Sequence, residues 1–364
     1  MLLLFLCIMA ASFGCVLISS VTRNMKGGVD AYLPTQIISI ILGIVVYLVV
    51  SAISLDWLSR FWKWIAAFNV GFMLLLIPFG VDGGTGNKSW LYLPGVPFSI
   101  QAPEVAKVGF ILLLAAQMQF FQKRGRLNGL LPVASYFSHT LFMAALIVVL
   151  SDDMGVALIY IAILLAMMVG AGIHPLWFLG MGAVAGAAAP ILWSMVLTDR
   201  QKNRILITLN PQMDPLGVGW HSILSMNTLS AGGLTGQGLY QGQQTGKANF
   251  PGQHTDFIFT VAGEELGFIG CLAVLLLLCL IIFRVLLTAR RAKDTLGVLV
   301  CFGVAGMMIF QTFENVLMCA GLSPVIGLTL PFFSCGGSSN VVMFAAMGLV
   351  SSVRFHKKTT WLDV

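Results

Sequence analysis

Residues 271–283 read CLAVLLLLCLIIF, a run of thirteen residues without a charged side chain or an amide. The run lies inside a longer apolar segment, 257–287. An α-helix needs roughly 20 apolar residues to cross the hydrocarbon core of a bilayer. This segment is long enough, so we predict that it is a membrane-spanning helix.

Nine further segments meet the same criterion of length and composition. In chain order, the ten segments are 1–22, 35–54, 61–80, 103–121, 130–150, 153–172, 174–197, 257–287, 295–320 and 335–353. Only Ser151-Asp152-Asp153 separates the fifth segment from the sixth, and a count of nine would put the two chain ends on opposite sides. We predict an all-α, polytopic membrane protein with about ten transmembrane helices, forming one membrane domain over residues 1–364.

The composition excludes several other classes of protein. Of the 364 residues, 58% are hydrophobic and only 9% are charged, whereas a soluble domain carries about 25% charged residues. This excludes a cytosolic enzyme and a disordered chain. The net charge is +6, but the basic residues are dispersed between apolar segments, which argues against binding to nucleic acid. The seven cysteines show no CxxC spacing and are predicted to be packing residues.

Basic residues decide the orientation in the membrane. With ten spans, one side of the membrane receives 12 of the 20 Lys and Arg residues in short connections and in the C-terminal tail. They are Arg60, Lys63, Lys123, Arg124, Arg126, Arg284, Arg290, Arg291, Lys293, Arg354, Lys357 and Lys358. Cytoplasmic loops carry such an excess of positive charge. Both termini are therefore predicted to be cytoplasmic.

Residues 198–256 form a 59-residue connection between spans seven and eight, with nine glycines. A loop of this length is usually functional or disordered, and the orientation places it on the outer face. Within it, 220–229 has helical spacing and is predicted to lie along the membrane surface. The glycine-rich stretch, residues 231–238, lacks the Lys-Ser/Thr ending of a P-loop. Tight turns explain its glycines at least as well as a phosphate cradle.

Ionisable residues inside spanning segments are costly and by default mark a functional pathway. Glu104 and Lys107 are spaced i,i+3 at the start of the fourth span, and Asp153 opens the sixth. The orientation puts all three near the outer ends of their helices, where they can share one polar cavity. Two interpretations stay open: a structural salt bridge that pins the helices, or a substrate-binding cluster.

Five more residues have a structural and a functional interpretation. Glu314, and the adjacent Glu264 and Glu265, are predicted to be structural, the latter two because carboxylates favour a helix N-terminus. Asp256 stands where the outer loop re-enters the bilayer and can face both water and a membrane-embedded substrate. Its alternative role is to cap the eighth span. Arg204, in the outer loop, is suited to a phosphorylated lipid or to general lipid anchoring.

Several segments taken together resemble one known family. They are Gln101-Ala102-Pro103-Glu104 with Lys107, Asp153-Met154-Gly155, 232–238, His254-Thr255-Asp256-Phe257-Ile258-Phe259, Glu264-Glu265-Leu266-Gly267, Leu330-Pro331-Phe332-Phe333-Ser334 and Gly336-Gly337-Ser338-Ser339. In these segments and in its span count, the chain resembles the SEDS family (shape, elongation, division and sporulation), which includes RodA, FtsW and SpoVE. Gln-Ala-Pro-Glu stands where the family has Gln-Pro-Ser-Glu, a departure that bears on subfamily and partner choice.

The resemblance implies a peptidoglycan glycosyltransferase that polymerises lipid II at the outer face of the bacterial cytoplasmic membrane. It implies that Asp256 is the catalytic residue and that a class B penicillin-binding protein, a transpeptidase, is the partner. The residues expected to line the substrate cavity are Glu104, Lys107, Asp153, Arg204, His254, Thr255, Ser338 and Ser339.

The expected chemistry is general-base catalysis by Asp256 on the acceptor sugar's 4-hydroxyl. Lys107, Arg204 or a bound divalent cation (Mg²⁺ or Mn²⁺) would stabilise the departing pyrophosphate, although the sequence shows no metal-ligand cluster. Two other functions stay open. One is a flippase for the lipid-linked precursor, against which stands the lack of the internal repeats found in many transporters. The other is a non-catalytic scaffold for a transpeptidase.

Overall fold

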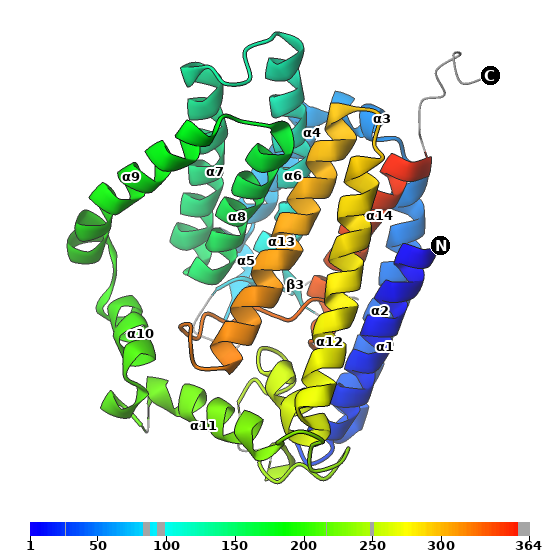
Figure 1. The fold of residues 1–364 in the computed structure, drawn as a ribbon, viewed down its shortest axis with the longest axis vertical. Helices are drawn as coiled ribbons and strands as arrows, with labels where there is room; N and C mark the ends of the chain where they lie inside the picture. The colour runs from blue at the N-terminus through cyan, green and yellow to red at the C-terminus, as the bar shows by residue number, and fades with distance from the viewer. Residues whose placement is uncertain (26, 83–87, 93–98, 216, 248–250, 356–364) are drawn as a thin grey trace.

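The computed structural model describes residues 1–25, 27–82, 88–92, 99–215, 217–247 and 251–355, and Figure 1 shows a bundle of long helices. The helices are α1 (Leu2–Thr22), α2 (Gly28–Ala52), α3 (Leu55–Arg60), α4 (Trp62–Leu74), α5 (Leu76–Phe79), α6 (Ala102–Lys123), α7 (Leu130–Ser151), α8 (Met154–Ala171), α9 (Pro175–Ile191), α10 (Asp199–Leu209), α11 (Val218–Ala231), α12 (Ile258–Arg290), α13 (Thr295–Cys319) and α14 (Gly337–Phe355). Short helical turns are η1 (Leu192–Val196), η2 (Pro211–Met213) and η3 (Thr245–Lys247).

Ten helical segments of the described chain are long and apolar enough to cross a membrane, and each corresponds to one of the predicted spans. The count of ten is therefore confirmed. Asp152 ends α7 in the left-handed conformation with φ 52°, which makes a sharp break between the fifth and sixth spans. The second span differs most from its predicted bounds, because α2 begins at Gly28 and contains Pro34. Lys357 and Lys358 lie outside the described residues.

The core of the bundle is formed around α13, which packs against α6, α8, α12 and α14. By contrast, α9 has no buried residue among those described, and in Figure 1 it leans away from the bundle. The outer connection of 198–256 is largely ordered. Its helix α11 packs against α12, and Ser225 of α11 is fully buried. The predicted helix at 220–229 is thus present, with one face packed on the protein.

The glycine-rich stretch, residues 231–238, supplies backbone hydrogen-bond partners at a break in α12. At Gly267 the backbone has φ 67° and ψ −164°, a conformation that only glycine adopts readily. The break leaves amides and carbonyls of α12 without their usual helical partners. The Phe268 amide donates to the carbonyl of Gly233 at 2.9 Å, and the Gln237 amide donates to the carbonyl of Glu264 at 2.9 Å. The backbone of the stretch therefore stabilises the two parts of α12 on either side of the break.

The carboxylates of Glu264 and Glu265, just before this break, have structural hydrogen-bond partners, in line with their prediction. The Glu264 carboxylate accepts hydrogen bonds from the amides of Gln244 at 2.7 Å and Thr245 at 3.0 Å. Glu265 accepts from the Ser20 hydroxyl of α1 at 2.5 Å. These contacts tie the outer connection and α1 to the first turns of α12.

A small sheet lies at the end of the bundle where α6 begins, and it was not predicted. Strands β1 (Gly80–Val81), β2 (Trp90–Leu91) and β3 (Ile100–Gln101) pair antiparallel, with Gly80 opposite Leu91 and Trp90 opposite Gln101. Two-residue strands are shorter than any periodic pattern that a sequence can display. The sheet matters because β3 leads directly into α6 and so fixes the start of that helix.

Candidate active site

The predicted pair at the start of α6 is formed directly. Residues i and i+3 are neighbours on a helix surface, and the Lys107 Nζ donates to the Glu104 Oε1 at 2.6 Å. Lys107 is fully buried and Glu104 is 3% exposed. A buried charge is strongly unfavourable unless it is paired, so each of these two residues depends on the other.

Asp153 stands beside this pair without joining it in a three-way salt bridge. Its Oδ1 accepts from the amide of Val156 at 3.0 Å and so caps α8, and its Oδ2 accepts from the Gln101 Nε2 at 3.2 Å. The Tyr160 hydroxyl of α8 donates to the carbonyl of Pro103 at 2.9 Å. These bonds join the N-terminal ends of α6 and α8, so the structure brings Glu104, Lys107 and Asp153 together as expected.

Asp256 lies in the turn that precedes α12, and its side chain is partly exposed. The N-cap of α12 is Phe257, and no side-chain hydrogen bond caps this helix. The capping role considered for Asp256 is therefore not found. The backbone of the turn is fixed instead, because the Asn315 side chain donates to the carbonyl of Asp256 at 2.7 Å and to that of Leu328 at 2.7 Å.

The loop between α13 and α14 (320–336) connects Asp256 with Asp153. A Cβ built on Gly155, in the first turn of α8, would lie 2.7 Å from the carbonyl oxygen of Ile326, so the two backbones are in contact. One residue later, a Cβ on Gly327 would lie 3.5 Å from the Asp256 Oδ2. The carboxylate of Asp256 thus faces the same short segment of the loop that packs beside Asp153.

The electrostatic surroundings of Asp256 are unusual for an aspartate. Burial raises the pKa of Asp256 to about 6, and the negative charge of Asp153 adds to the rise. A hydrogen bond from Thr255 acts in the opposite direction. The group is therefore a stronger base than an ordinary aspartate with its pKa near 3.9. Burial also lowers the pKa of the neighbouring His254, which keeps that ring neutral near pH 7.

The second signature, 330–339, holds the turn of Asp256 in place. The Ser334 hydroxyl donates to the carbonyl of Thr255 at 2.5 Å, and the amide of Cys335 donates to the carbonyl of His254 at 2.9 Å. Ser338 lies nearer to α6, because its hydroxyl accepts from the amide of Gln101 at 3.2 Å. Together with Ser339, which bonds to Thr329 at 3.1 Å, these contacts bring the two predicted signatures to one place.

Sequence reasoning missed Gln36, which anchors this arrangement from α2. The side chain is fully buried; its Nε2 donates to the carbonyl of Ser334 and its Oε1 accepts from the amide of Gly336, both at 3.2 Å. Ser334 in turn contacts the residue before Asp256. The available signal was a lone amide side chain within an otherwise apolar helix, two residues after Pro34.

Arg204 differs from the other predicted site residues in its placement. It lies on α10, which packs mainly against α11 and η2, whereas the carboxylates stand at the ends of α6, α8 and α12. A capping box at Thr198 and Gln201 begins α10, and the Gln201 Nε2 donates to the Asp152 Oδ1 at 3.1 Å. A role for Arg204 with the substrate stays a prediction.

The residues of the site do not form a protein-held cation site. Across the described part of the chain, no group of three or more His, Cys, Asp or Glu side chains is placed to hold a metal ion. Asp153 already accepts two hydrogen bonds, and Glu104 is paired with Lys107. The described residues therefore supply no complete protein ligand set for Mg²⁺ or Mn²⁺, and we assign no step to a metal.

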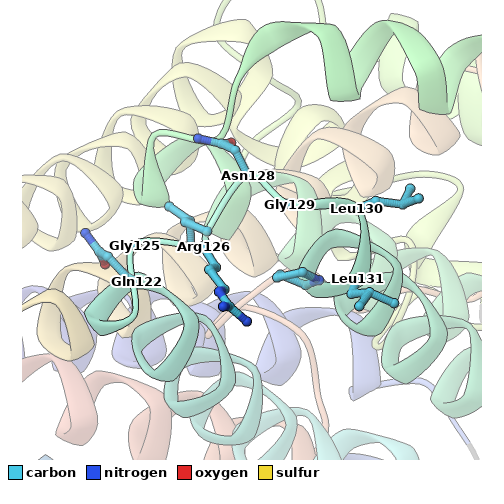
Figure 2. A pocket seen from close by; sticks show the side chains of 9 residues that line it. Gln122, Gly125, Arg126, Asn128, Gly129, Leu130 and Leu131 are labelled. Carbon is cyan, nitrogen blue, oxygen red and sulfur yellow. The ribbon is translucent and has the colours of Figure 1, made fainter.

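A hollow of about 680 Å³ lies at the opposite end of α6, in the connection to α7 (Figure 2). It is lined by Arg126, Asn128 and their neighbours between Gln122 and Pro132, with no carboxylate. Because α6 spans from Glu104 at one end to this connection at the other, the hollow is separated from Asp256 by the length of a transmembrane helix. It is not part of the candidate active site.

The chain is similar to known proteins over its whole length. A family model described as "Cell cycle protein", for FtsW, RodA and SpoVE, matches residues 1–359. The probable peptidoglycan glycosyltransferase FtsW of Trichlorobacter lovleyi is 33% identical over 97% of this chain and 92% of its own. The peptidoglycan glycosyltransferase MrdB of Escherichia coli K12 is 36% identical over 75% of this chain and 72% of its own.

Solved structures show the same fold. A chain from a study described as "Structural coordination of polymerization and crosslinking by a peptidoglycan synthase complex" superposes with a TM-score of 0.83 at 27% identity, covering 98% of both chains. The rod shape determining protein RodA of Thermus thermophilus superposes with a TM-score of 0.71 at 25% identity, covering 98% of this chain and 97% of its own.

Proposed function

Because this chain belongs to the FtsW/RodA/SpoVE family of cell cycle proteins, we propose that Asp256 is the general base of its sugar-transfer reaction. The chain is a peptidoglycan glycosyltransferase and a multi-pass membrane protein. We take its substrate to be lipid II, a disaccharide-pentapeptide on undecaprenyl pyrophosphate, bound at the outer face of the membrane. Both termini then lie at the cytoplasmic end of the bundle.

The observation that supports this role is the placement of the Asp256 carboxylate. The peptide around it is held by Asn315 and Ser334, and its side chain does not cap the helix that follows. Residue 256 as a whole is partly exposed, and it lies in the turn just before α12. A fixed backbone with an acidic group that does not cap the following helix is what a positioned base requires, since general-base catalysis depends on placing the base within hydrogen-bond reach of the proton.

In the proposed step, Asp256 accepts the proton of the acceptor sugar's 4-hydroxyl. That oxygen forms a bond to the anomeric carbon of the donor while the bond from this carbon to undecaprenyl pyrophosphate breaks, with inversion. Proton transfer to a positioned base contributes about 10²–10⁴-fold. The remaining acceleration has to come from aligning two lipid-anchored substrates and from stabilising the negative pyrophosphate. We assign the latter to Lys107, the buried cation of the site.

Purified protein offered lipid II in liposomes tests this function directly. Glycan strands formed from lipid II that is already on the outer leaflet require no transport, so product on a gel supports a polymerase. A flippase would move labelled lipid II across the bilayer without forming strands. The reaction is run with and without Mg²⁺ or Mn²⁺, and an absolute cation requirement would contradict the assignment of no step to a metal.

The polymerisation rate is expected to fall in acid. Because the pKa of Asp256 is raised to about 6, the fraction of ionised base drops about tenfold for each pH unit below that value. The rate should be near its plateau above pH 7. Replacing Asp153 with Asn removes a negative charge that raises the pKa of Asp256, so the acid limb of the remaining activity should move to lower pH. A limb that does not move would show that Asp153 and Asp256 are not coupled.

Gln36 is proposed as a positioning residue for Asp256. Replacing Gln36 with Leu leaves the amide of Gly336 without its partner, at roughly 1–3 kcal/mol, and leaves the carbonyl of Ser334 with only the Asn340 side chain, at 3.4 Å. The turn of Asp256 then loosens, and we expect kcat to fall about tenfold or more with little change in KM. Gln36→Glu keeps the acceptor for Gly336 and should recover part of kcat. Equal stability loss in both variants with unchanged kcat would show a purely structural role.

A class B penicillin-binding protein is proposed as the partner. The support is the close superposition on a chain from a study of coordinated polymerization and crosslinking. Co-purification of the two proteins from cells tests this partner. The scaffold alternative makes a distinct prediction: cells with Asp256→Asn would grow like the wild type, whereas cells that lack the whole chain would not.

A further inference from the structure

We propose that the hollow between α1, α12 and α14 binds the phosphate headgroup of an anionic phospholipid. The hollow measures about 370 Å³, and its lining includes Arg284 of α12, Arg354 of α14 and the apolar side chains of Leu2 and Leu3. It lies where α1 begins and α14 ends, beside the last two turns of α12. Lipid II polymerisation is assigned to the opposite end, so this is a separate site.

The depth of Arg284 is the first reason. It stands six residues before Arg290, where α12 ends, which places its Cα about 9 Å from that helix end at a rise of 1.5 Å per residue. A long basic side chain this close to a helix end can reach the headgroup level of the membrane. In the described chain, the two salt bridges are Lys107–Glu104 and Lys202–Asp199. Neither arginine of the hollow is paired with an acid there.

The polar groups in the hollow match an anion. Arginines from two different helices, Arg284 of α12 and Arg354 of α14, line one space, and the planar guanidinium group of arginine binds phosphate bidentately. The two hydroxyls in the lining are already engaged. Thr288 donates to the carbonyl of Arg284 at 2.9 Å, and Ser351 bonds to the hydroxyl of Tyr47 at 2.5 Å. The anion would therefore be held by Arg284 and Arg354.

The rim of the hollow favours a lipid over a soluble phosphate. Leu2 is 46% exposed and Phe355 is 61% exposed, and both residues belong to the lining. They stand beside the arginines at the end of membrane-spanning helices, where an acyl chain can lie against them. Basic pockets between transmembrane helices on the cytoplasmic side are known to bind anionic headgroups. The charge, the depth and the apolar rim together indicate an anionic phospholipid of the inner leaflet.

The test titrates the detergent-purified full-length protein with phosphatidylglycerol and counts bound lipid by native mass spectrometry. The variant is Arg284→Gln with Arg354→Gln. The matched control is Arg290→Gln with Arg291→Gln, which removes the same charge at the same end of the bundle but outside the hollow. We take each arginine that contacts the bound headgroup to strengthen binding about fivefold, which corresponds to about 1 kcal/mol. We therefore expect about 30-fold weaker binding in the first variant and less than about threefold in the control.

Three results would overturn the proposal. Equal weakening in both double variants would mean general attraction to positive charge. Phosphatidylcholine that binds the wild-type protein as tightly as phosphatidylglycerol would mean that charge plays no part. Glycerol phosphate that competes as well as the lipid would assign the hollow to a soluble phosphate. If the double variant does not fold, as judged by size-exclusion chromatography, the single variants are used, each with an expected loss of about fivefold.

Discussion

Replacing Asp256 with Asn is expected to reduce polymerisation of lipid II by about 10²–10⁴-fold, the contribution of a positioned general base. Asn has nearly the same shape as Asp but cannot accept the proton of the acceptor hydroxyl. The peptide of residue 256 should stay in place, because Asn315 and Ser334 bind backbone carbonyls of this turn. Glycan strands are measured on a gel with purified protein, and the thermal midpoint Tm is measured in the same detergent.

The control for this variant is Asp199→Asn. Asp199 lies in the same outer connection, and its side chain is 99% exposed, with only a 3.9 Å contact to Lys202. It should retain the wild-type rate and Tm. Polymerisation by Asp256→Asn at the wild-type rate would refute the assignment. A large fall in its Tm would point instead to a structural role for the carboxylate.

The second large effect concerns the buried pair of α6. Replacing Lys107 with Met leaves the Glu104 carboxylate buried without its counter-charge, and breaking a buried ion pair costs about 3–5 kcal/mol. Removing both charges, with Glu104→Gln and Lys107→Met, should recover most of this free energy of unfolding. If Lys107 acts on the departing pyrophosphate, activity should stay low in the double variant although stability returns.

This pattern separates the two interpretations that the sequence left open. A double variant that recovers both stability and activity would make the pair purely structural. Asp199 and Lys202 supply the comparison, since they have the same i,i+3 spacing but are 3.9 Å apart, with the Asp199 side chain fully exposed and that of Lys202 partly exposed. Exposed pairs contribute about 0–1 kcal/mol. Lys202→Met should therefore change both Tm and polymerisation little.

The ten spans, and the charged residues at the ends of these spans, could be predicted from the sequence. The reason is that the cost of burying polar groups in lipid acts on each segment by itself. An apolar run of about 20 residues has few alternatives to a spanning helix. The i,i+3 spacing of Glu104 and Lys107 likewise followed from the geometry of one helix. The small sheet and the early start of α2 were missed, because neither interrupts or extends an apolar run in a visible way.

The functional signatures were located by resemblance, but how they meet was not contained in any of them. The carboxylate of Asp256 faces Gly327, Gly155 packs on the adjoining Ile326, and Gln36 reaches across from α2 to hold the loop. These contacts join residues up to 300 positions apart. The glycine-rich stretch gained its role only from the break in α12 at Gly267.

Local sequence thus determines which segments form spanning helices and in which order, whereas the packing of the helices determines the active site. Insertion into a bilayer is decided segment by segment, since every backbone group of a spanning helix is satisfied within that helix. A catalytic carboxylate depends on hydrogen bonds and charges contributed by other segments, and these exist only once α2, α6, α8, α12 and the loop before α14 have come into contact.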